Sequence, residues 1–190
     1  MRLIKRMEQQ SDAYYIGQVL AGNTGALKYL IDRYQHMAFT LAFRVLNDER
    51  EAEEVCQDAF LKAYKSLGSL KNHAHFSTWL YSIVYHSAVS AVRKRKIHFV
   101  SIEQKGNIKL TEIAEDDEDG TDEIGRDQLD KALLKLDETD RVIVSLYYLQ
   151  DYDVRTLCGV TGLSPSNVKI RLFRARKKLY GILSCHVYEK

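Results

Sequence analysis

Hydrophobic residues recur every three or four positions along most of this chain, which is the spacing of one buried face of an α-helix. Alternation of the β-strand kind is nearly absent, and one proline leaves little to interrupt helices. The sequence therefore predicts an all-α protein. In the first half the pattern predicts four helices, which begin near Asp12, Ala26, Asp48 and Phe76. The fourth runs to the basic cluster Arg93-Lys94-Arg95-Lys96.

Polar and glycine residues mark the boundaries between these helices. Gly22-Asn23 ends the first helix, Asn47-Asp48 ends the second, and the stretch from Ser66 to His75 has the composition of a loop. Asp48 followed by Glu51 resembles a capping box, which predicts the start of the third helix. The inward face of that helix is predicted to consist of Ala52, Val55, Ala59, Phe60 and Ala63.

The helical spacing of hydrophobic residues ends after the basic cluster. From Ile97 to Gly125 the chain carries nine acidic residues against two lysines and shows little periodicity. Such a segment cannot bury enough apolar surface to fold alone, so we expect a mobile acidic linker. A solvated spacer is the simple interpretation, although an acidic segment could also occupy a basic channel that nucleic acid later fills. The sequence thus predicts two small helical domains, residues 1–96 and 127–190, joined by the linker 97–126.

The helical period returns in the second half. Leu129, Leu133, Leu134 and Leu136 carry this period, and Asp137 is placed to cap a following helix that runs to Leu149. We expect these two helices to form the hydrophobic platform on which the last segment of the chain rests.

That last segment, from Asp153 to Leu179, has the pattern of a helix-turn-helix. Gly162 permits a sharp turn, and Ser164-Pro165 supplies an N-cap and a proline at the first helical position. Val168, Leu172, Ala175 and Leu179 then form a buried stripe. The other side is cationic, which suits the major groove of DNA. The predicted DNA contacts are Ser166, Asn167, Lys169, Ile170, Arg171, Phe173, Arg174, Lys177 and Lys178.

The alternative is an amphipathic terminal helix whose basic face is simply solvated. The cap, the turn, the buried stripe and the basic face all agree with one another, which favours DNA binding.

Aromatic residues of the fourth helix offer a second candidate for nucleic-acid binding. Tyr81 and Tyr85 fall off the buried stripe and precede the basic helix end, so we expect them to be exposed. Exposed rings beside cations can stack the bases of a single strand. The other interpretation, that an aromatic residue here belongs to the core, is favoured for Phe76 and Trp79.

Composition and charge narrow the classes of function. The chain has 190 residues, 45% of them hydrophobic, and a formal net charge of only +2, so charge has to be judged by segment. Cys56, Cys158 and Cys185 lie far apart without a CxxC spacing, which disfavours zinc and fits free thiols in a reducing compartment. Because no apolar run is long enough to span a membrane, we expect a cytoplasmic protein without membrane insertion.

An enzyme is not indicated by the sequence. The acids Glu51, Glu53 and Glu54 lack a paired histidine or a metal-ligand constellation, and Gly-rich phosphate loops are missing. His73 and His75 alternate on the expected loop without a third ligand nearby. We therefore expect no catalytic residue, no metal and no cofactor.

Three stretches together resemble the bacterial sigma factors of the extracytoplasmic-function (ECF) group, in the sigma-70 family. EAEEVCQDAF and FSTWLYSIV are similar to the family's first promoter-binding domain, called region 2. The stretch from LKLDETDRVIVSLYYL to IRLFRARKKL is similar to its terminal domain, called region 4. The resemblance implies a non-enzymatic specificity subunit that binds core RNA polymerase and promoter DNA and directs transcription initiation.

The resemblance also implies roles for three groups of residues. The helix after Asp48 would dock on core polymerase through Glu51, Glu53, Glu54, Gln57, Asp58 and Leu61. The loop and the fourth helix would recognise and melt the minus-10 element through Lys71, Asn72, His73, His75, Tyr81, Tyr85, His86 and Arg93. The recognition helix, with Lys169, Ile170, Phe173 and Arg174, would face the minus-35 element.

One alternative function stays open from the sequence. It is a stand-alone helix-turn-helix regulator whose N-terminal helices sense a ligand or bind a partner; such regulators usually bind repeated half-sites as dimers.

An anti-sigma factor is a possible partner under the sigma-factor interpretation. Relatives often have one, and this chain's motifs do not identify it.

Overall fold

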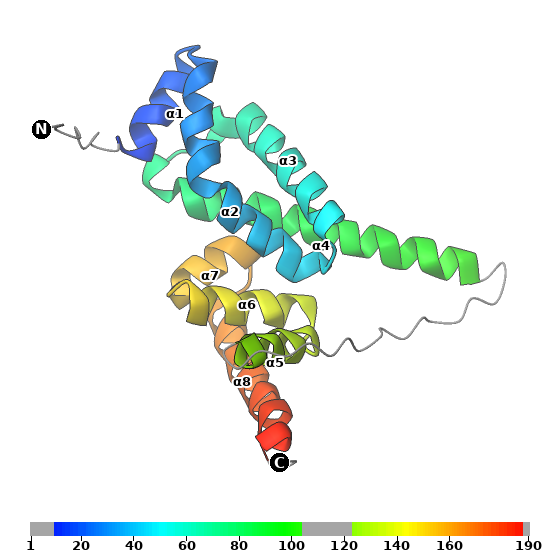
Figure 1. Ribbon diagram of the computed structural model, residues 1–190. Coiled ribbons are helices and arrows are strands. Elements are labelled where there is room, and N and C mark those ends of the chain that lie inside the picture. The colour runs from blue at the N-terminus through cyan, green and yellow to red at the C-terminus, as the bar shows by residue number, and fades with distance from the viewer. Residues whose placement is uncertain (1–9, 104–122, 188–190) are drawn as a thin grey trace, which may run out of the picture.

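The protein is described by a computed structural model that covers residues 10–103 and 123–187. Every regular element in these ranges is helical (Figure 1), which confirms the all-α prediction. The first half holds α1 (Asp12–Leu20), α2 (Leu27–Leu46), α3 (Glu49–Ser66) and α4 (Phe76–Glu103). The second half holds α5 (Glu123–Leu134), α6 (Glu138–Leu149), α7 (Val154–Thr161) and α8 (Pro165–Val187). Short 3-10 turns η1 (Thr24–Ala26), η2 (Leu67–Ser69) and η3 (His73–His75) connect them.

The predicted linker differs from the structure at both ends. Helix α4 continues to Glu103, beyond the basic cluster where we expected it to stop, and α5 begins at Glu123. The remainder of the predicted linker, residues 104–122, lies outside the described residues. Apolar Ile97, Phe99 and Val100 continue the chain after Lys96, and they contain no helix-breaking proline or glycine, which accounts for the longer helix.

Side-chain caps begin the helices where the sequence places them. The Asp48 carboxylate accepts the Glu51 amide at 2.9 Å, and the Asp137 carboxylate accepts the Asp140 amide at 2.8 Å. Asn47 ends α2 in the left-handed region with a φ of 50°, so the chain can turn directly into α3. These contacts satisfy amides that have no partner within the helix.

The first half is a helical bundle in which α2, α3 and α4 pack on one another and α1 lies against the start of α2. Its interior contains Ile16, Leu30, Leu41, Phe76 and Leu80, all fully buried. Two predicted members of the inward face of α3, Val55 and Phe60, are only partly buried, whereas Cys56, which we did not predict there, is buried. The remaining predicted members Ala52, Ala59 and Ala63 are buried.

The second half consists of α5, α6 and α7 gathered along one side of α8 (Figure 1). Leu133, Ile143, Leu146 and Leu157 meet Val168 in its interior. This confirms that the two helices after Asp127 serve as a platform for the helix-turn-helix.

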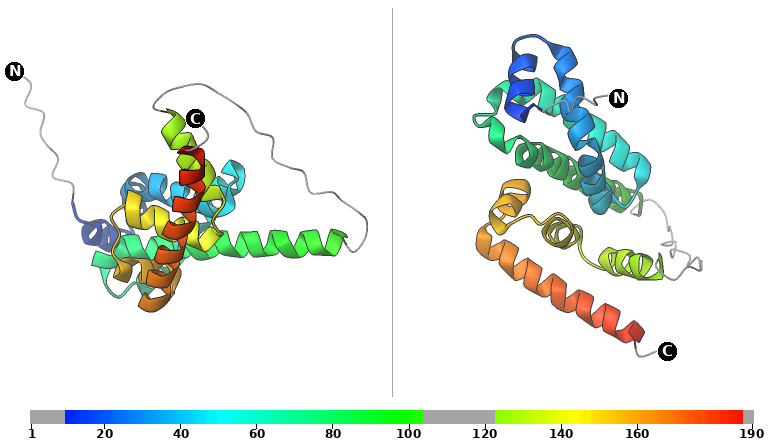
Figure 2. Two further views of the ribbon diagram at one scale, coloured as in Figure 1. Left: turned by 90° about the horizontal axis from the view of Figure 1, so that it is seen from below. Right: turned by 60° about the vertical axis from the view of Figure 1, so that its left-hand side comes forward.

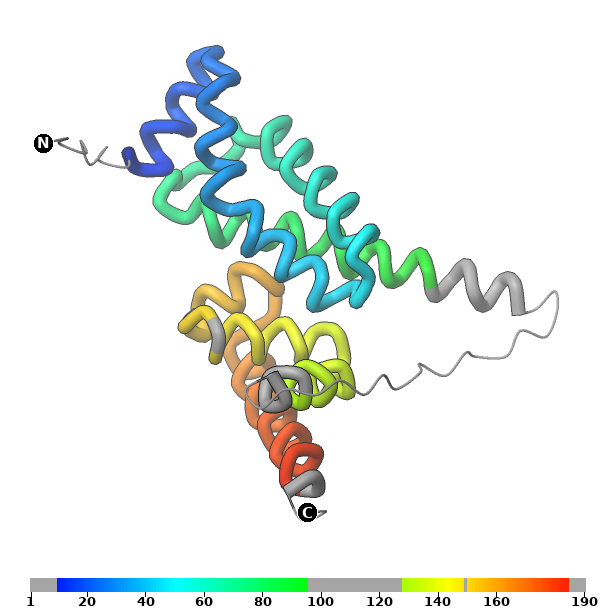
Figure 3. The backbone as a smooth tube through the Cα atoms, in the orientation of Figure 1, coloured from blue at the N-terminus to red at the C-terminus, as the bar shows by residue number. Residues whose placement is uncertain are grey.

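The two halves lie against each other. Helix α7 packs on α4 and α6 packs on α2, and the turned views of Figure 2 and the tube of Figure 3 show the same arrangement. The buried residues of both halves form one continuous hydrophobic cluster. We call this contact between the halves the seam. It brings α4, which carries the predicted melting residues, under the first helix of the helix-turn-helix.

Candidate nucleic-acid interface

The outer face of α8 is the most exposed of the predicted surfaces. Asp153 caps α7, Gly162 ends it at a φ of 73°, and the Ser164 hydroxyl accepts the Asn167 amide at 3.3 Å to begin α8. Val168, Leu172 and Ala175 fix one side of α8 in the core. On the opposite side Ile170 is 47% and Phe173 is 67% exposed. Also exposed are Ser166, Asn167, Lys169, Arg174, Lys177 and Lys178, which we call the reading face together with Ile170 and Phe173.

Arg171, which we also predicted to contact DNA, differs from the members of that face because it is partly buried and its guanidinium is engaged in ion pairs. Its guanidinium donates to Asp140 at 2.6 Å and lies 3.3 Å from a second carboxylate, that of Asp137. Burial raises the pKa of the Asp140 carboxyl, while the hydrogen bond that Arg171 donates to Asp140 raises the pKa of Arg171. Arg171 therefore attaches α8 to the start of α6: it stands at the edge of the reading face, one turn from Asn167, and its carboxylate partners hold its guanidinium.

The predicted minus-10 loop folds into η2 and η3. The Asn72 side chain accepts the Ala74 amide at 3.0 Å and so caps η3. Lys71, Asn72 and His75 are exposed and His73 is half-buried. A pocket of about 370 Å³ lies beside the loop and is lined by Lys71, Asn72, His75 and Trp79, with Gly159 of α7 forming part of its wall.

Tyr81 and Tyr85 contradict the expectation of exposure, since they are only 3% and 5% exposed. The Tyr81 ring lies between those of Tyr34 and Tyr152, with centroids 6.0 and 6.3 Å away. The Tyr85 hydroxyl is hydrogen-bonded to the Thr139 hydroxyl at 3.0 Å. Burial raises the pKa of Tyr81. Both rings are covered because the second half of the chain packs on this side of α4, which the helical period of α4 alone could not indicate.

The other predicted residues of α4 have different surroundings. Phe76 is buried and Trp79 is half-buried, as the core interpretation expected. His86 is exposed but faces Gly162 from α4, and Arg93 is exposed. The structure therefore does not gather the eight predicted minus-10 residues on one open surface.

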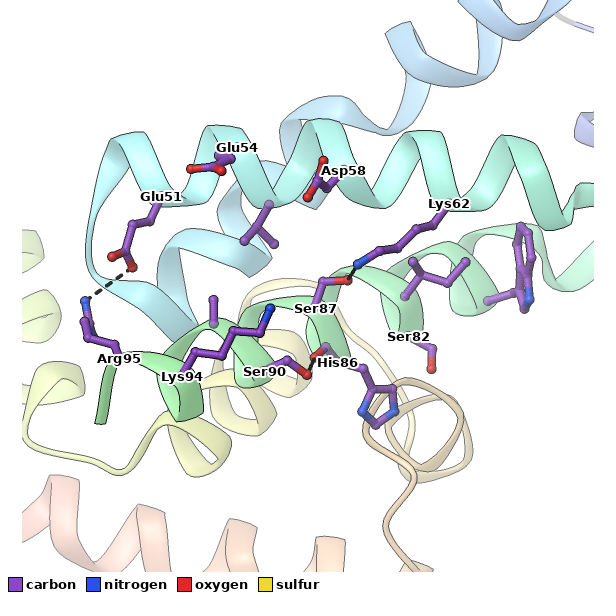
Figure 4. Close-up of a pocket in the computed structure, with 14 residues that line it drawn as sticks. Glu51, Glu54, Asp58, Lys62, Ser82, His86, Ser87, Ser90, Lys94 and Arg95 are labelled. Carbon is purple, nitrogen blue, oxygen red and sulfur yellow. Dashed lines mark hydrogen bonds and ion pairs between the residues drawn. The ribbon is translucent and has the colours of Figure 1, made fainter. Parts of the chain in front are cut away.

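The acidic residues of α3 lie along a groove of about 960 Å³ between α3 and α4 (Figure 4). Glu54 and Asp58 are exposed at its edge, while Glu51 is partly covered and pairs with Arg95 at 3.3 Å. Lys62 crosses the groove and donates to the Ser87 hydroxyl at 3.0 Å. Glu53, Gln57 and Leu61 are exposed too, so five of the six predicted docking residues are accessible.

Sequence reasoning missed the residues that join the two halves. Tyr152 and Thr139 contact Tyr81 and Tyr85, and Gly159 approaches Thr78. Arg141, only 7% exposed, donates to the carbonyls of Leu133, Leu134 and Leu136, and across the seam to that of Arg44. A glycine in the middle of a short amphipathic helix was the one available signal for such a contact.

Within the described ranges no three His, Cys, Asp or Glu side chains are grouped as metal ligands would be. Among the same residues, none of the helices has the length and hydropathy needed to cross a bilayer.

The fold and its surfaces define a helical protein with a helix-turn-helix at one end and an acid-edged helical bundle at the other. The Sigma-70 region 2 family matches residues 30–97, and the Sigma-70, region 4 family matches residues 126–179. The two matches together span more than half of the chain, in the order of the two structural halves. The chain belongs to the sigma-70 family.

Several named relatives are ECF sigma factors. The chain is 28% identical to the ECF RNA polymerase sigma factor SigW of Bacillus subtilis over 172 residues, 86% of this chain and 92% of the relative. It is 27% identical to the RNA polymerase sigma-H factor of Pseudomonas aeruginosa, with 91% of this chain and 94% of the relative covered. The same identity relates it to the ECF RNA polymerase sigma-E factor of Escherichia coli K12, with 90% and 94% covered.

Two solved structures share the fold. CnrH in complex with the cytosolic domain of CnrY is 22% identical, with a TM-score of 0.65 and 93% of this chain and 99% of the other covered. The sigma factor RpoE of Bartonella quintana, in complex with the anti-sigma factor NepR, is 21% identical, with a TM-score of 0.66 and 86% and 98% covered.

Proposed function

We propose that this protein is an ECF-type RNA polymerase sigma factor, a specificity subunit that binds core polymerase, reads promoter elements and acts without catalytic chemistry of its own. The observation that carries the proposal is the pairing, in one chain, of the region 2 and region 4 matches with an exposed cationic reading face on α8. The lack of overall charge excess fits this role, because the basic residues are concentrated where DNA would bind.

Each surface has a proposed partner. The reading face of α8 would enter the major groove of the minus-35 element, where Arg174 can contact guanine and the lysines can contact phosphates. The η2–η3 loop and α4 would act on the minus-10 element, with a base displaced from the duplex and stacked on an aromatic ring. The exposed acids of α3 would dock on a basic surface of core polymerase.

An anti-sigma factor is a further proposed partner. The Bartonella RpoE structure contains one, which motivates the search for such a protein here. Co-purification of the chain from its own cells, followed by a direct binding assay with the recovered protein, would test this.

The function is tested by run-off transcription with purified core polymerase on a fragmented genomic library. We expect the chain to direct initiation at a defined set of sites, each with two separated sequence elements. Core polymerase alone serves as the control. Binding of the chain to repeated half-sites as a dimer, with no change in initiation by core polymerase, would instead indicate a stand-alone helix-turn-helix regulator.

The docking surface is tested by charge reversal on α3. Glu54→Lys and Asp58→Lys should each weaken the complex with core polymerase severalfold, more at low salt than at high salt, because exposed ion pairs are screened. The matched control is Asp32→Lys, a reversal at an exposed acid of α2. If titration shows the same loss for all three variants, the effect is one of overall charge and the α3 assignment is wrong.

A further inference from the structure

Two members of the reading face have side chains that cannot form hydrogen bonds with DNA. Ile170 and Phe173 are wholly apolar, yet both are exposed in the middle of the cationic side of α8. Burying such side chains against a partner is favourable, because apolar surface is removed from water. Lys169 and Arg174 flank the pair, so a partner that covers it has to carry negative charge as well.

The buried side of α8 fixes the direction in which this apolar pair points. Val168, Leu172 and Ala175 are buried where α8 packs on α5, α6 and α7, so the opposite side of the helix faces outward. Ile170 and Phe173 are three positions apart, which places them on one side of the helix and about 4.5 Å apart along its axis. Neighbouring base pairs of duplex DNA are about 3.4 Å apart. The pair can therefore touch two neighbouring base pairs at the same time.

The place of the pair along α8 suits contact with bases. Helix α8 begins at Pro165, and the N-terminal part of a recognition helix is the part that contacts base edges. Ile170 is the sixth residue of this helix and Phe173 is the ninth. Tyr180 is exposed as well, but it lies about two turns beyond Phe173. An exposed aromatic residue of α8 that lies outside the expected base contacts is thus present for comparison.

The major groove displays only one apolar group at its base edges, the methyl group on C5 of thymine. The other groups there are hydrogen-bond donors and acceptors, which an isoleucine or a phenylalanine would cover without satisfying them. A thymine beside the pair would gain an apolar contact, whereas cytosine or guanine would lose hydrogen bonds to water. Ile170 and Phe173 should therefore favour thymine over the other three bases at the positions that they touch.

We propose that Ile170 and Phe173 read thymine: each contacts the C5 methyl group of a thymine in the minus-35 element, beside the guanine proposed for Arg174. This inference rests on the proposed function of the chain. Arg174 is one turn after Ile170 and adjacent to Phe173, so the three side chains reach the same short stretch of the groove. The base preference of the element then depends on apolar contacts as well as on hydrogen bonds.

Removal of single methyl groups from the DNA tests these contacts. A promoter found by run-off transcription is synthesised with one thymine of its minus-35 element at a time, on either strand, replaced by deoxyuridine, which lacks only the methyl group. The affinity of the complex between the chain and core polymerase is measured for each duplex. At the two thymines that the pair contacts we expect a loss of about fourfold, the value for one buried methyl-sized group. The other thymines should show almost no loss.

Variants of the chain assign each methyl group to a side chain. The loss at one thymine should disappear in Ile170→Ala and the loss at the other in Phe173→Ala, because the residue that the methyl group contacts is already absent. Both side chains are exposed, so neither truncation should unfold α8. Tyr180→Ala is the matched aromatic control, and Leu134→Ala, at an exposed leucine of α5, is the aliphatic control. Both controls should keep the full response to deoxyuridine.

The variants also separate direct contact from DNA shape. A methyl group changes the shape of the duplex too, but an effect of shape alone would be equal in the unaltered chain and in every variant. Such equal responses would overturn the proposal. Equal binding of thymine and deoxyuridine duplexes by the unaltered complex, or a minus-35 element without thymine, would overturn it too.

Failure of the proposed function would have a different signature. Normal initiation without any response to deoxyuridine leaves that function standing and overturns only the thymine contacts. If the complex initiates at no promoter, the proposed function fails instead. The methyl contacts are then tested by the same deoxyuridine scan with the full chain alone, on a duplex that the chain selects from a random library.

Discussion

Aromatic residues on α4 and on α8 have opposite environments although their sequence contexts are alike. Tyr85 precedes a basic cluster on α4, and Phe173 stands among arginines and lysines on α8, yet Tyr85 is buried and Phe173 is exposed. The difference arises from what lies opposite each helix. Helix α4 is covered by α7, whereas the corresponding side of α8 has no neighbour among the described helices.

This comparison separates two requirements that promoter recognition places on one chain. Duplex DNA can be read from outside, so its reading residues can stay exposed without affecting the rest of the molecule. A surface that holds single-stranded bases needs aromatic rings, which in isolation are costly to expose to water. In this structure the second half of the chain covers the rings of Tyr81 and Tyr85.

The largest effect on this arrangement should come from Arg141, which binds the last carbonyls of α5 and the Arg44 carbonyl of α2 at once. Arg141→Met should lower the free energy of unfolding by about 3 kcal/mol, because buried carbonyls lose charged donors that a thioether cannot replace. The measurement is urea unfolding of the full chain. Arg155→Met, at an exposed position of α7, is the control and should be nearly neutral.

The residues of the reading face can be divided by experiment into those that contact bases and those that contact phosphates. Arg174→Ala should relax the preference at one minus-35 position by about 1–3 kcal/mol, because a bidentate contact with guanine is lost. Lys178→Ala should weaken all promoters about equally and reduce the salt slope by up to about one unit. Binding of the polymerase complex to a minus-35 duplex library at several salt concentrations measures both. A uniform loss for Arg174→Ala would contradict its role in base reading.

The sequence predicted the helices well because their signals are local. The Asp48 and Asp137 caps, the Gly162 turn and the stripe of Val168, Leu172 and Ala175 depend on residues a few positions apart. The exposure of the reading face followed from that stripe, since one side of a helix was fixed in the core.

The sequence could not predict what depends on the contact between the halves. Tyr81 and Tyr85 lie off the stripe that packs within the first half, and only the position of Tyr152 and Thr139, more than fifty residues later, explains their burial. The ion pairs of Arg171 could not be predicted for the same reason. Its carboxylate partners are on α6, and nothing in the spacing of α8 indicates that they face it.

The buried tyrosine of α4, Tyr85, can be tested by removing first its hydroxyl and then its ring. Tyr85→Phe removes the hydrogen bond to Thr139 but keeps the ring, so it should weaken the seam by about 1 kcal/mol and leave strand opening intact. Tyr85→Ala removes the ring too and should reduce permanganate reactivity of promoter thymines. Tyr64→Phe, at an exposed tyrosine of α3, is the matched control. Persistent opening with Tyr85→Ala would show that the ring only packs.

The smallest expected effect belongs to Arg171, where the assignment from sequence and the structure differ. If Arg171 fastens α8 to α6 through Asp140 and Asp137, Arg171→Ala should lower the free energy of unfolding by about 0.5–1 kcal/mol, a modest amount because the pair is partly exposed. Base preference at the minus-35 element should stay unchanged, since the guanidinium is held by Asp140 and Asp137. The two measurements are urea unfolding and the minus-35 library, with Lys178→Ala as the control that affects DNA binding without affecting stability. An altered base preference with unchanged stability would show that Arg171 contacts DNA and that its ion pairs break when DNA binds.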